Sequence, residues 1–116
     1  MEIREQSLLV LAALADGPRH GYAVSRAAEE LSDGRVRLTA GTLYGALDRL
    51  IARGLVAVDR EEVVSGRRRR YHRLTDEGRA ALEAETARLA GLVGALRRVG
   101  RDDASRAAIT SEGATA

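Results

Sequence analysis

The stretch that decides the fold is TAGTLYGALDRLIARGLV, which runs from Thr39 to Val56. Its larger apolar side chains stand at i, i+4, i+7 and i+8, the spacing of one face of a helix: Leu43, Leu47, Leu50 and Ile51. Thr39 is a favourable N-cap residue, and Gly54 is a favourable residue just after a helix. The stretch therefore predicts an amphipathic helix between these two residues, followed by an extended segment.

The residues before this helix predict two further helices. Ile3 to Ala15 is apolar on nearly all sides and is followed by Gly17-Pro18, so we expect a helix that other elements cover. Gly21 to Leu31 has a single apolar stripe and is followed by Ser32-Asp33-Gly34, a turn-forming cluster. Arg35 to Leu38 alternates polar and apolar residues, which predicts a brief strand.

The residues after it predict a hairpin and a long helix. Leu55 to Arg60 and Arg69 to Leu74 suit two extended strands, with Glu61 to Gly66 as the connection. Thr75-Asp76-Glu77 is typical of a helix start. The apolar residues that follow have heptad-like spacing, interrupted at Glu85, and predict a seam for a second subunit: Leu82, Leu89, Leu92, Leu96 and Val99.

The organisation expected from these patterns is a mainly α chain with a small β-hairpin. Residues 1–75 form a winged helix-turn-helix domain, residues 76–99 a C-terminal dimerisation helix, and residues 100–116 a disordered tail, because the apolar pattern ends at Gly100. Helix, helix, short strand, helix, hairpin and long helix is the order of elements in a winged helix-turn-helix, in which the third helix enters the major groove.

Composition excludes several classes of function. The 116 residues suffice for one compact domain, and the absence of Cys excludes disulfides, thiolate nucleophiles and Cys-ligated zinc. With only His20 and His72 as histidines and no Ser or Thr near a suggestive His–carboxylate arrangement, we expect neither a metal site, nor a cofactor, nor catalysis. The apolar run Leu8 to Ala15 is too short for a membrane span and lacks a basic leader, so a cytoplasmic location is expected.

The basic residues are all Arg, and five of them lie close together: Arg67, Arg68, Arg69, Arg70 and Arg73. Guanidinium groups bind phosphate and guanine edges in a bidentate manner that Lys cannot match. An isolated run of this kind is usually a solvated surface, but on the hairpin of a winged helix it favours contact with DNA. Strand alternation places Arg67 and Arg69 on one face and Arg68 and Arg70 on the other, where some can pair with Glu61 or Glu62.

Three segments of the chain resemble the signature segments of the PadR family of transcriptional regulators. They are HGYA at residues 20–23, GTLY with the leucines up to GLV at residues 41–56, and GRRRRYHRLTDEG at residues 66–78. The resemblance covers roughly Leu8 to Leu96. It implies a homodimeric repressor whose last helix supplies much of the interface, and some family members respond to phenolic acids or multidrug-type ligands. Gly45 and His72 depart from residues common in the family.

The sequence thus predicts a sequence-specific DNA-binding regulator, expected to be a repressor that a small apolar or phenolic effector releases from double-stranded operator DNA. An adaptor that keeps the winged fold but binds proteins is the alternative. For His20, capping of a helix and contact with phosphate are both open. Leu8 joins the seam residues in the expected dimer interface, and the expected DNA-binding residues are His20, Tyr22, Thr39, Gly41, Thr42, Tyr44, Gly45, Arg49, Arg67, Arg68, Arg69 and Arg70.

Overall fold

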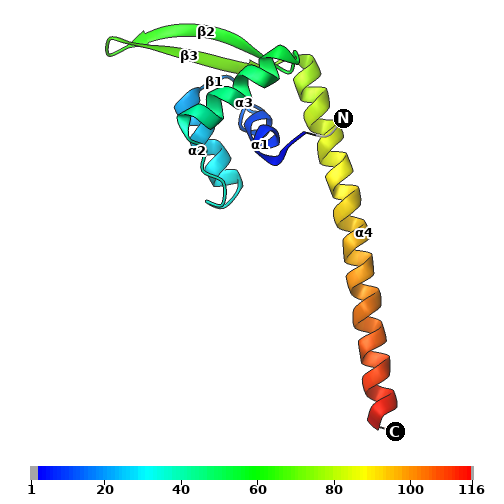
Figure 1. Cartoon of the computed structure of the whole chain (residues 1–116). Coiled ribbons are helices and arrows are strands. Elements are labelled where there is room, and N and C mark those ends of the chain that lie inside the picture. Colours follow the sequence, from blue (N-terminus) through cyan, green and yellow to red (C-terminus); the bar gives the residue numbers. More distant parts are fainter. Residues whose placement is uncertain (1–2, 116) are drawn as a thin grey trace. The chain divides into compact units, whose positions relative to one another are not determined.

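The computed structural model describes residues 3–115, and the side chains of residues 3–104 and 106. Along the chain it forms α1 (Glu5–Ala13), β1 (Arg19–His20), α2 (Gly21–Leu31), α3 (Ala40–Ala52), β2 (Val56–Val64), β3 (Arg67–Leu74) and α4 (Asp76–Thr115) (Figure 1). The predicted fold class, mainly helical with a small β-hairpin, is confirmed. The chain divides into two compact units, Met1–Glu83 and Ala84–Ala116, with the boundary inside α4.

The core of the first unit lies among α1, α2 and α3. Leu11 and Leu14 come from α1 and its end, Val24 from α2, and Leu47 and Leu50 from α3, and all are at most 1% exposed. Truncating one such leucine to alanine costs about 2–5 kcal/mol, because a cavity remains. The apolar stripe predicted for α3 is therefore the side that holds the three helices together.

The helix ends explain where the predicted boundaries were right and where they were wrong. α3 ends at Ala52, and Gly54 follows it as expected with a φ of +75°, while the Leu55 N–H closes the end by donating to the Leu50 carbonyl at 2.9 Å. α1 is shorter than the predicted Ile3 to Ala15. The Leu14 N–H donates to the Leu11 carbonyl, three residues back, and this tighter turn ends the helix at Ala13.

The strand predicted at Arg35 to Leu38 is wrong. This segment is a loop held by side-chain contacts: Ser32 Oγ accepts from the Val36 N–H at 2.9 Å, Arg35 pairs with Glu5, and Arg37 pairs with Glu29 at 3.2 Å. An alternating tetrapeptide becomes a strand only where a sheet edge is free to pair with it. Here the edge of β3 is taken instead by β1, through the pairs Arg19–His72 and His20–Tyr71.

The wing, which we define as β2, β3 and the turn Ser65–Gly66 between them, is longer than predicted. The antiparallel sheet has the order β1-β3-β2, and pairing of β2 with β3 continues to Val64–Arg67. Ser65 and Gly66 both have positive φ, at 52° and 76°, as a two-residue type I′ hairpin turn requires. The predicted connection from Glu61 to Gly66 is thus mostly strand.

The root of the wing is fastened to the start of α4. Thr75 caps α4 as predicted, because its hydroxyl accepts from the Gly78 N–H at 2.9 Å while donating to the Gly54 carbonyl at 2.6 Å. A Cβ atom at residue 78 would lie 1.9 Å from the Leu55 carbonyl oxygen, so only glycine fits there. These contacts fix where the wing begins relative to α3.

α4 continues to Thr115, beyond the end at Val99 that the sequence predicted. The loss of apolar periodicity marks the end of a packed face and not the end of a helix, because Ala104, Ala107 and Ala108 favour helix and no proline intervenes.

The predicted interface residues differ in burial. Leu8 and Leu82 are partly buried against the core of the first unit, and Leu89 is partly buried. Leu92, Leu96 and Val99 are 49%, 62% and 57% exposed.

Glu85, which interrupts the predicted seam, is only 5% exposed, and its two carboxylate oxygens accept hydrogen bonds from Arg88, each at 3.0 Å. Within residues 3–115 we find no helix that combines the length and the apolar character needed to span a bilayer.

Candidate nucleic-acid interface

The N-terminal end of α3 carries two threonines in different roles. The Thr39 hydroxyl accepts a hydrogen bond from the Thr42 backbone N–H at 3.2 Å and donates one to the Thr42 side-chain oxygen at 3.0 Å. Thr39 is therefore used as the N-cap of the helix. The Thr42 hydroxyl keeps its own proton for an outside acceptor, so of these two predicted contact residues Thr42 is the better placed.

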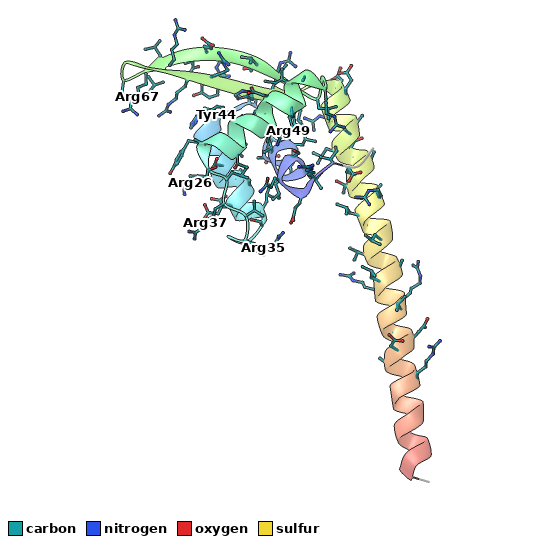
Figure 2. The ribbon with its side chains drawn as sticks, in the orientation of Figure 1. Arg26, Arg35, Arg37, Tyr44, Arg49 and Arg67 are labelled. Atoms are coloured by element: carbon teal, nitrogen blue, oxygen red, sulfur yellow. The ribbon has the colours of Figure 1, made fainter. Side chains whose placement is uncertain are left out.

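Tyr44 is held in place by the start of α2. A Cβ atom at residue 21 would lie 2.6 Å from the Tyr44 hydroxyl oxygen, so the phenol rests directly on the backbone of Gly21. Tyr44 remains 49% exposed and projects from α3 (Figure 2). The neighbouring Tyr22 is 68% exposed, with the Arg26 guanidinium 5.9 Å from its ring centroid. The glycine of the HGYA segment thus positions an aromatic side chain of a different helix.

The two glycines predicted on the exposed face of α3 differ in their surroundings. At Gly45, the position of a Cβ atom lies 3.4 Å from the Arg49 guanidinium, so Arg49 folds back along the helix over this glycine. At Gly41, no atom lies within 4 Å of the Cβ position. Gly45 leaves room for an arginine one turn later, and Gly41 leaves an open surface.

The wing has two faces, as strand alternation predicted. Glu61 lies opposite Arg70 in the register, and Glu62 lies opposite Arg69, so the two carboxylates belong to opposite faces. We call the face with Glu61, Arg68 and Arg70 the inner face, because these three side chains share a hollow with Tyr44 of α3. The other face, with Glu62, is the outer face. All four residues from Arg67 to Arg70 are exposed, and Arg67 lies at the tip of the wing (Figure 2).

Ion pairs differ between the two faces. On the inner face, Arg70 binds one carboxylate oxygen of Glu61 through Nε at 3.1 Å and through a terminal nitrogen at 3.0 Å, and Arg68 lies 4.0 Å from the other oxygen. On the outer face, Arg60 binds Glu62 at 2.8 Å and stacks 4.1 Å from the Tyr71 ring centroid. The hydrogen bond from Arg60 is the main cause that lowers the pKa of Glu62.

Two adjoining hollows connect α3 with the wing. One, of about 250 Å³, is lined by Tyr44, Glu61, Arg68 and Arg70. The other, of about 210 Å³, adds the start of α2, since it is lined by His20, Gly21, Tyr22, Tyr44, Arg68, Arg69 and Arg70. The structure thus brings together predicted residues from three parts of the sequence on one concave, basic surface.

His20 is a helix cap, one of the two roles that the sequence left open. Its Nδ1 accepts from the Ala23 N–H at 3.4 Å at the start of α2, and its ring meets the Tyr71 ring edge to face at 5.5 Å. Partial burial, and then the nearby Arg69, lower the pKa of His20. A largely neutral imidazole at neutral pH is a poor partner for phosphate compared with the arginines beside it.

His72 lies in the root of the wing and is 2% exposed. Its Nδ1 is buried without a hydrogen-bond partner. Burial is the main cause that lowers the pKa of His72, Arg70 lowers it further, and Asp48 opposes both. The imidazole, which departs from the residues common in the family, is thus packed in the wing root with one ring nitrogen left without a hydrogen-bond partner.

Sequence reasoning missed two arginines near the start of α3. Arg26 of α2 and Arg37 of the preceding loop line a larger hollow of about 550 Å³, together with Tyr22, Ser25, Glu29, Leu38, Ala40, Leu43 and Tyr44. The available signal for Arg26 was its position four residues after Tyr22, one helical turn away on the same face.

Among the described residues, no group of three or more His, Asp or Glu side chains lies close enough together to bind a metal ion.

Comparison with known proteins identifies relatives over most of the chain. A protein of the transposon TN4556 from Streptomyces fradiae, described as an uncharacterized 37.1 kDa protein, is 47% identical over 94 residues, which are 81% of this chain and 26% of that protein. The transcriptional regulator Rv3488 of Mycobacterium tuberculosis is 45% identical over 75 residues, 65% of this chain and 66% of the regulator. The chain therefore matches less than two thirds of the length of either relative.

Solved structures share the fold. A PadR family transcriptional regulator from Eggerthella lenta is 29% identical, with a TM-score of 0.65 over 82% of this chain and 83% of that one. Bacillus subtilis PadR, solved in complex with operator DNA, is 21% identical, with a TM-score of 0.62 over 70% of this chain and 46% of that one. The family model described as "Transcriptional regulator PadR-like family" matches residues 10–84, which include α2, α3 and the wing. The chain belongs to the PadR-like family of transcriptional regulators, which are not enzymes.

Proposed function

We propose that this chain is a cytoplasmic, sequence-specific regulator that binds double-stranded operator DNA through α3 and the wing. The observation that carries the proposal is the shared hollow in which Tyr44 of α3 meets Arg68 and Arg70 of the wing. A helix that fits the major groove and a basic hairpin beside it can then contact bases and backbone of one duplex simultaneously. Operator binding by a distant structural neighbour, Bacillus subtilis PadR, supports the same role.

The two elements have different tasks in this proposal. Thr42, Tyr44 and Arg49 of α3 approach base edges, and the small surface of Gly41 allows close contact with the groove. Arg67 to Arg70 neutralise phosphates, which adds affinity for any sequence. His20 and Tyr22 at the start of α2 line the second hollow and border the contact with the backbone.

Binding as a homodimer is the second part of the proposal. Leu92, Leu96 and Val99 recur at heptad-like spacing and are about half exposed or more. Exposed leucines in such a row are stabilised when a second copy of the helix covers them. A two-fold dimer would bind two half-sites about one helical turn apart.

We further propose that the regulator is a repressor that a small effector releases. Repression requires only that the dimer occupy a promoter site, which the proposed interface provides. An apolar or phenolic effector suits a cavity walled by aliphatic side chains of a dimer seam. It would act only if its affinity differs between the DNA-bound spacing of the two α3 helices and another spacing.

The alternative is an adaptor that binds a protein through the wing or α4. Salt dependence separates the two functions. In fluorescence anisotropy with a labelled random-sequence duplex, we expect log affinity to fall linearly with log salt concentration, by about 0.9 per phosphate contact. Selection from a random-sequence pool should then yield a preferred duplex. Failure to bind any duplex at low salt would exclude DNA binding and favour the adaptor.

A further inference from the structure

Glu61 occupies an unusual place for a carboxylate in the candidate interface. It lies on the inner face of the wing, in the hollow that Tyr44, Arg68 and Arg70 complete. Its side chain is about 41% exposed, so solvent and DNA can both reach it. A negative charge here opposes every phosphate that approaches the inner arginines, which raises the question of what it contributes.

The contacts of Glu61 orient two arginines at once. One oxygen accepts a hydrogen bond from Nε of Arg70 at 3.1 Å and lies 3.0 Å from a terminal nitrogen of the same guanidinium, and the other oxygen faces Arg68 at 4.0 Å. A guanidinium has five N–H donors, so Arg70 keeps donors free after this pairing. One arginine can therefore be bound by the carboxylate and still donate to a correctly placed phosphate or base edge.

The geometry thus separates two kinds of DNA complex. Where α3 has the right register, a partner group meets arginines that are already oriented, and less side-chain entropy is lost on binding. Where the register is wrong, phosphates take other positions, the arginines stay fixed by Glu61, and the carboxylate repels the backbone. The same residue supports the matched complex and opposes the mismatched one.

We propose that Glu61 is a positioning residue that raises the specificity of this regulator, by holding Arg68 and Arg70 on the inner face and by repelling DNA that is out of register. The proposal rests on DNA binding by α3 and the wing. Glu62 provides a matched control, because this neighbouring carboxylate lies on the outer face and pairs with Arg60.

The test compares Glu61→Gln with Glu62→Gln, since each removes one negative charge and keeps the shape of the side chain. Anisotropy titrations use a random-sequence duplex and the duplex that the wild type selects from a random pool. We expect Glu61→Gln to raise affinity for random DNA about 3- to 10-fold while affinity for the selected duplex changes less than about 2-fold. Glu62→Gln should shift both affinities by one common factor.

Arg70→Lys provides a second variant that keeps the charge but not the bidentate geometry. We expect it to lower the ratio of selected to random affinity, whereas a role for charge alone predicts an unchanged ratio. Thermal unfolding of each variant reports whether the wing is intact. The proposal would be overturned if Glu61→Gln, like Glu62→Gln, changed the affinities for both duplexes by the same factor, and if Arg70→Lys left the ratio of selected to random affinity unchanged. If the wild-type protein bound no DNA duplex at all, the proposed function itself would be refuted.

Discussion

α3 and the wing form one concave surface but differ in chemistry. The exposed side of α3 offers few groups, with a threonine hydroxyl, a phenol supported by Gly21 and an arginine folded over Gly45. The wing offers four exposed arginines in succession, partly neutralised by Glu61 on its inner face. Groups that are few and fixed in position suit discrimination between bases, and many charges suit affinity. In the proposed function, discrimination between bases therefore falls mainly to α3 and affinity mainly to the wing, where Glu61 adds to discrimination.

The largest effect is expected when the proposed dimer dissociates, because α3 and the wing of one subunit then act without those of the second subunit. Leu92→Glu with Leu96→Glu places carboxylates in the proposed seam and should dissociate the dimer, because charged groups without partners are costly to bury. Affinity for the selected duplex should fall by roughly 100-fold or more, since one half-site no longer assists the other. Analytical ultracentrifugation and anisotropy measure the two effects.

The control for the seam is Ala87→Glu with Ala90→Glu, which adds the same charge at exposed positions on another side of α4. It should leave the dimer intact. Dimers that persist in the leucine variant would show that the subunits associate through another surface.

The next largest effect concerns the wing. Replacing Arg67, Arg68, Arg69 and Arg70 with Gln should weaken binding to both selected and random duplexes, by about 10- to 100-fold near 0.1 M salt, and somewhat more for the selected duplex because the oriented Arg68 and Arg70 are lost. The slope of log affinity against log salt should shrink by about 0.9 for each phosphate that the variant wing no longer neutralises. Arg97→Gln with Arg98→Gln, on α4, serves as the control with an unchanged slope. A wing variant that keeps the wild-type slope would remove the wing from the interface.

A smaller and more selective effect is expected at α3. In Gly21→Ala, the new Cβ would lie 2.6 Å from the Tyr44 hydroxyl oxygen, so the phenol must move away. We expect the ratio of selected to random affinity to fall about 10-fold, in line with the loss of one base-directed contact. The salt slope should stay the same. Gly91→Ala, which adds a methyl group in open space on α4, is the matched variant and should keep the ratio.

The smallest effect is a pH dependence of stability at the root of the wing. Burial lowers the pKa of His72 from its ordinary value of 6.5, so the unfolded chain binds a proton more readily than the folded one. The contribution of this group to stability is complete above pH 6.5. It is lost as the pH falls from 6.5 through the lower pKa of the folded protein, because protonation then favours the unfolded chain.

Urea unfolding between pH 8 and about pH 5 measures this loss. His72→Gln should flatten the dependence of the unfolding free energy on pH. His20→Gln should leave most of this dependence in place, because His20 is the more exposed of the two imidazoles. A profile that is equally steep with and without His72 would assign the dependence to other groups.

The helices and most residues of the candidate interface could be predicted from the sequence, because the signals for them are local. Apolar spacing and caps indicated α2 and α3, Thr75 indicated the start of α4, and the motif residues indicated the arginines of the wing. The failures involve partners distant in sequence. Nothing in Arg35 to Leu38 reveals that β3 pairs with Arg19–His20 instead, and nothing local to Gly21 reveals the ring of Tyr44 above it. The end of α4 was missed because alanines sustain a helix without an apolar stripe.

The central claim, that α3 contacts bases while the wing contacts the backbone, is tested most directly by chemical interference on the selected duplex. We expect methylation of guanine N7 to block binding in two patches about 10 base pairs apart, flanked by positions where phosphate ethylation blocks it. Thr42→Ala with Tyr44→Ala should erase part of the guanine pattern and leave the phosphate pattern in place. Interference confined to phosphates, with no base position that matters in the wild type, would contradict the account.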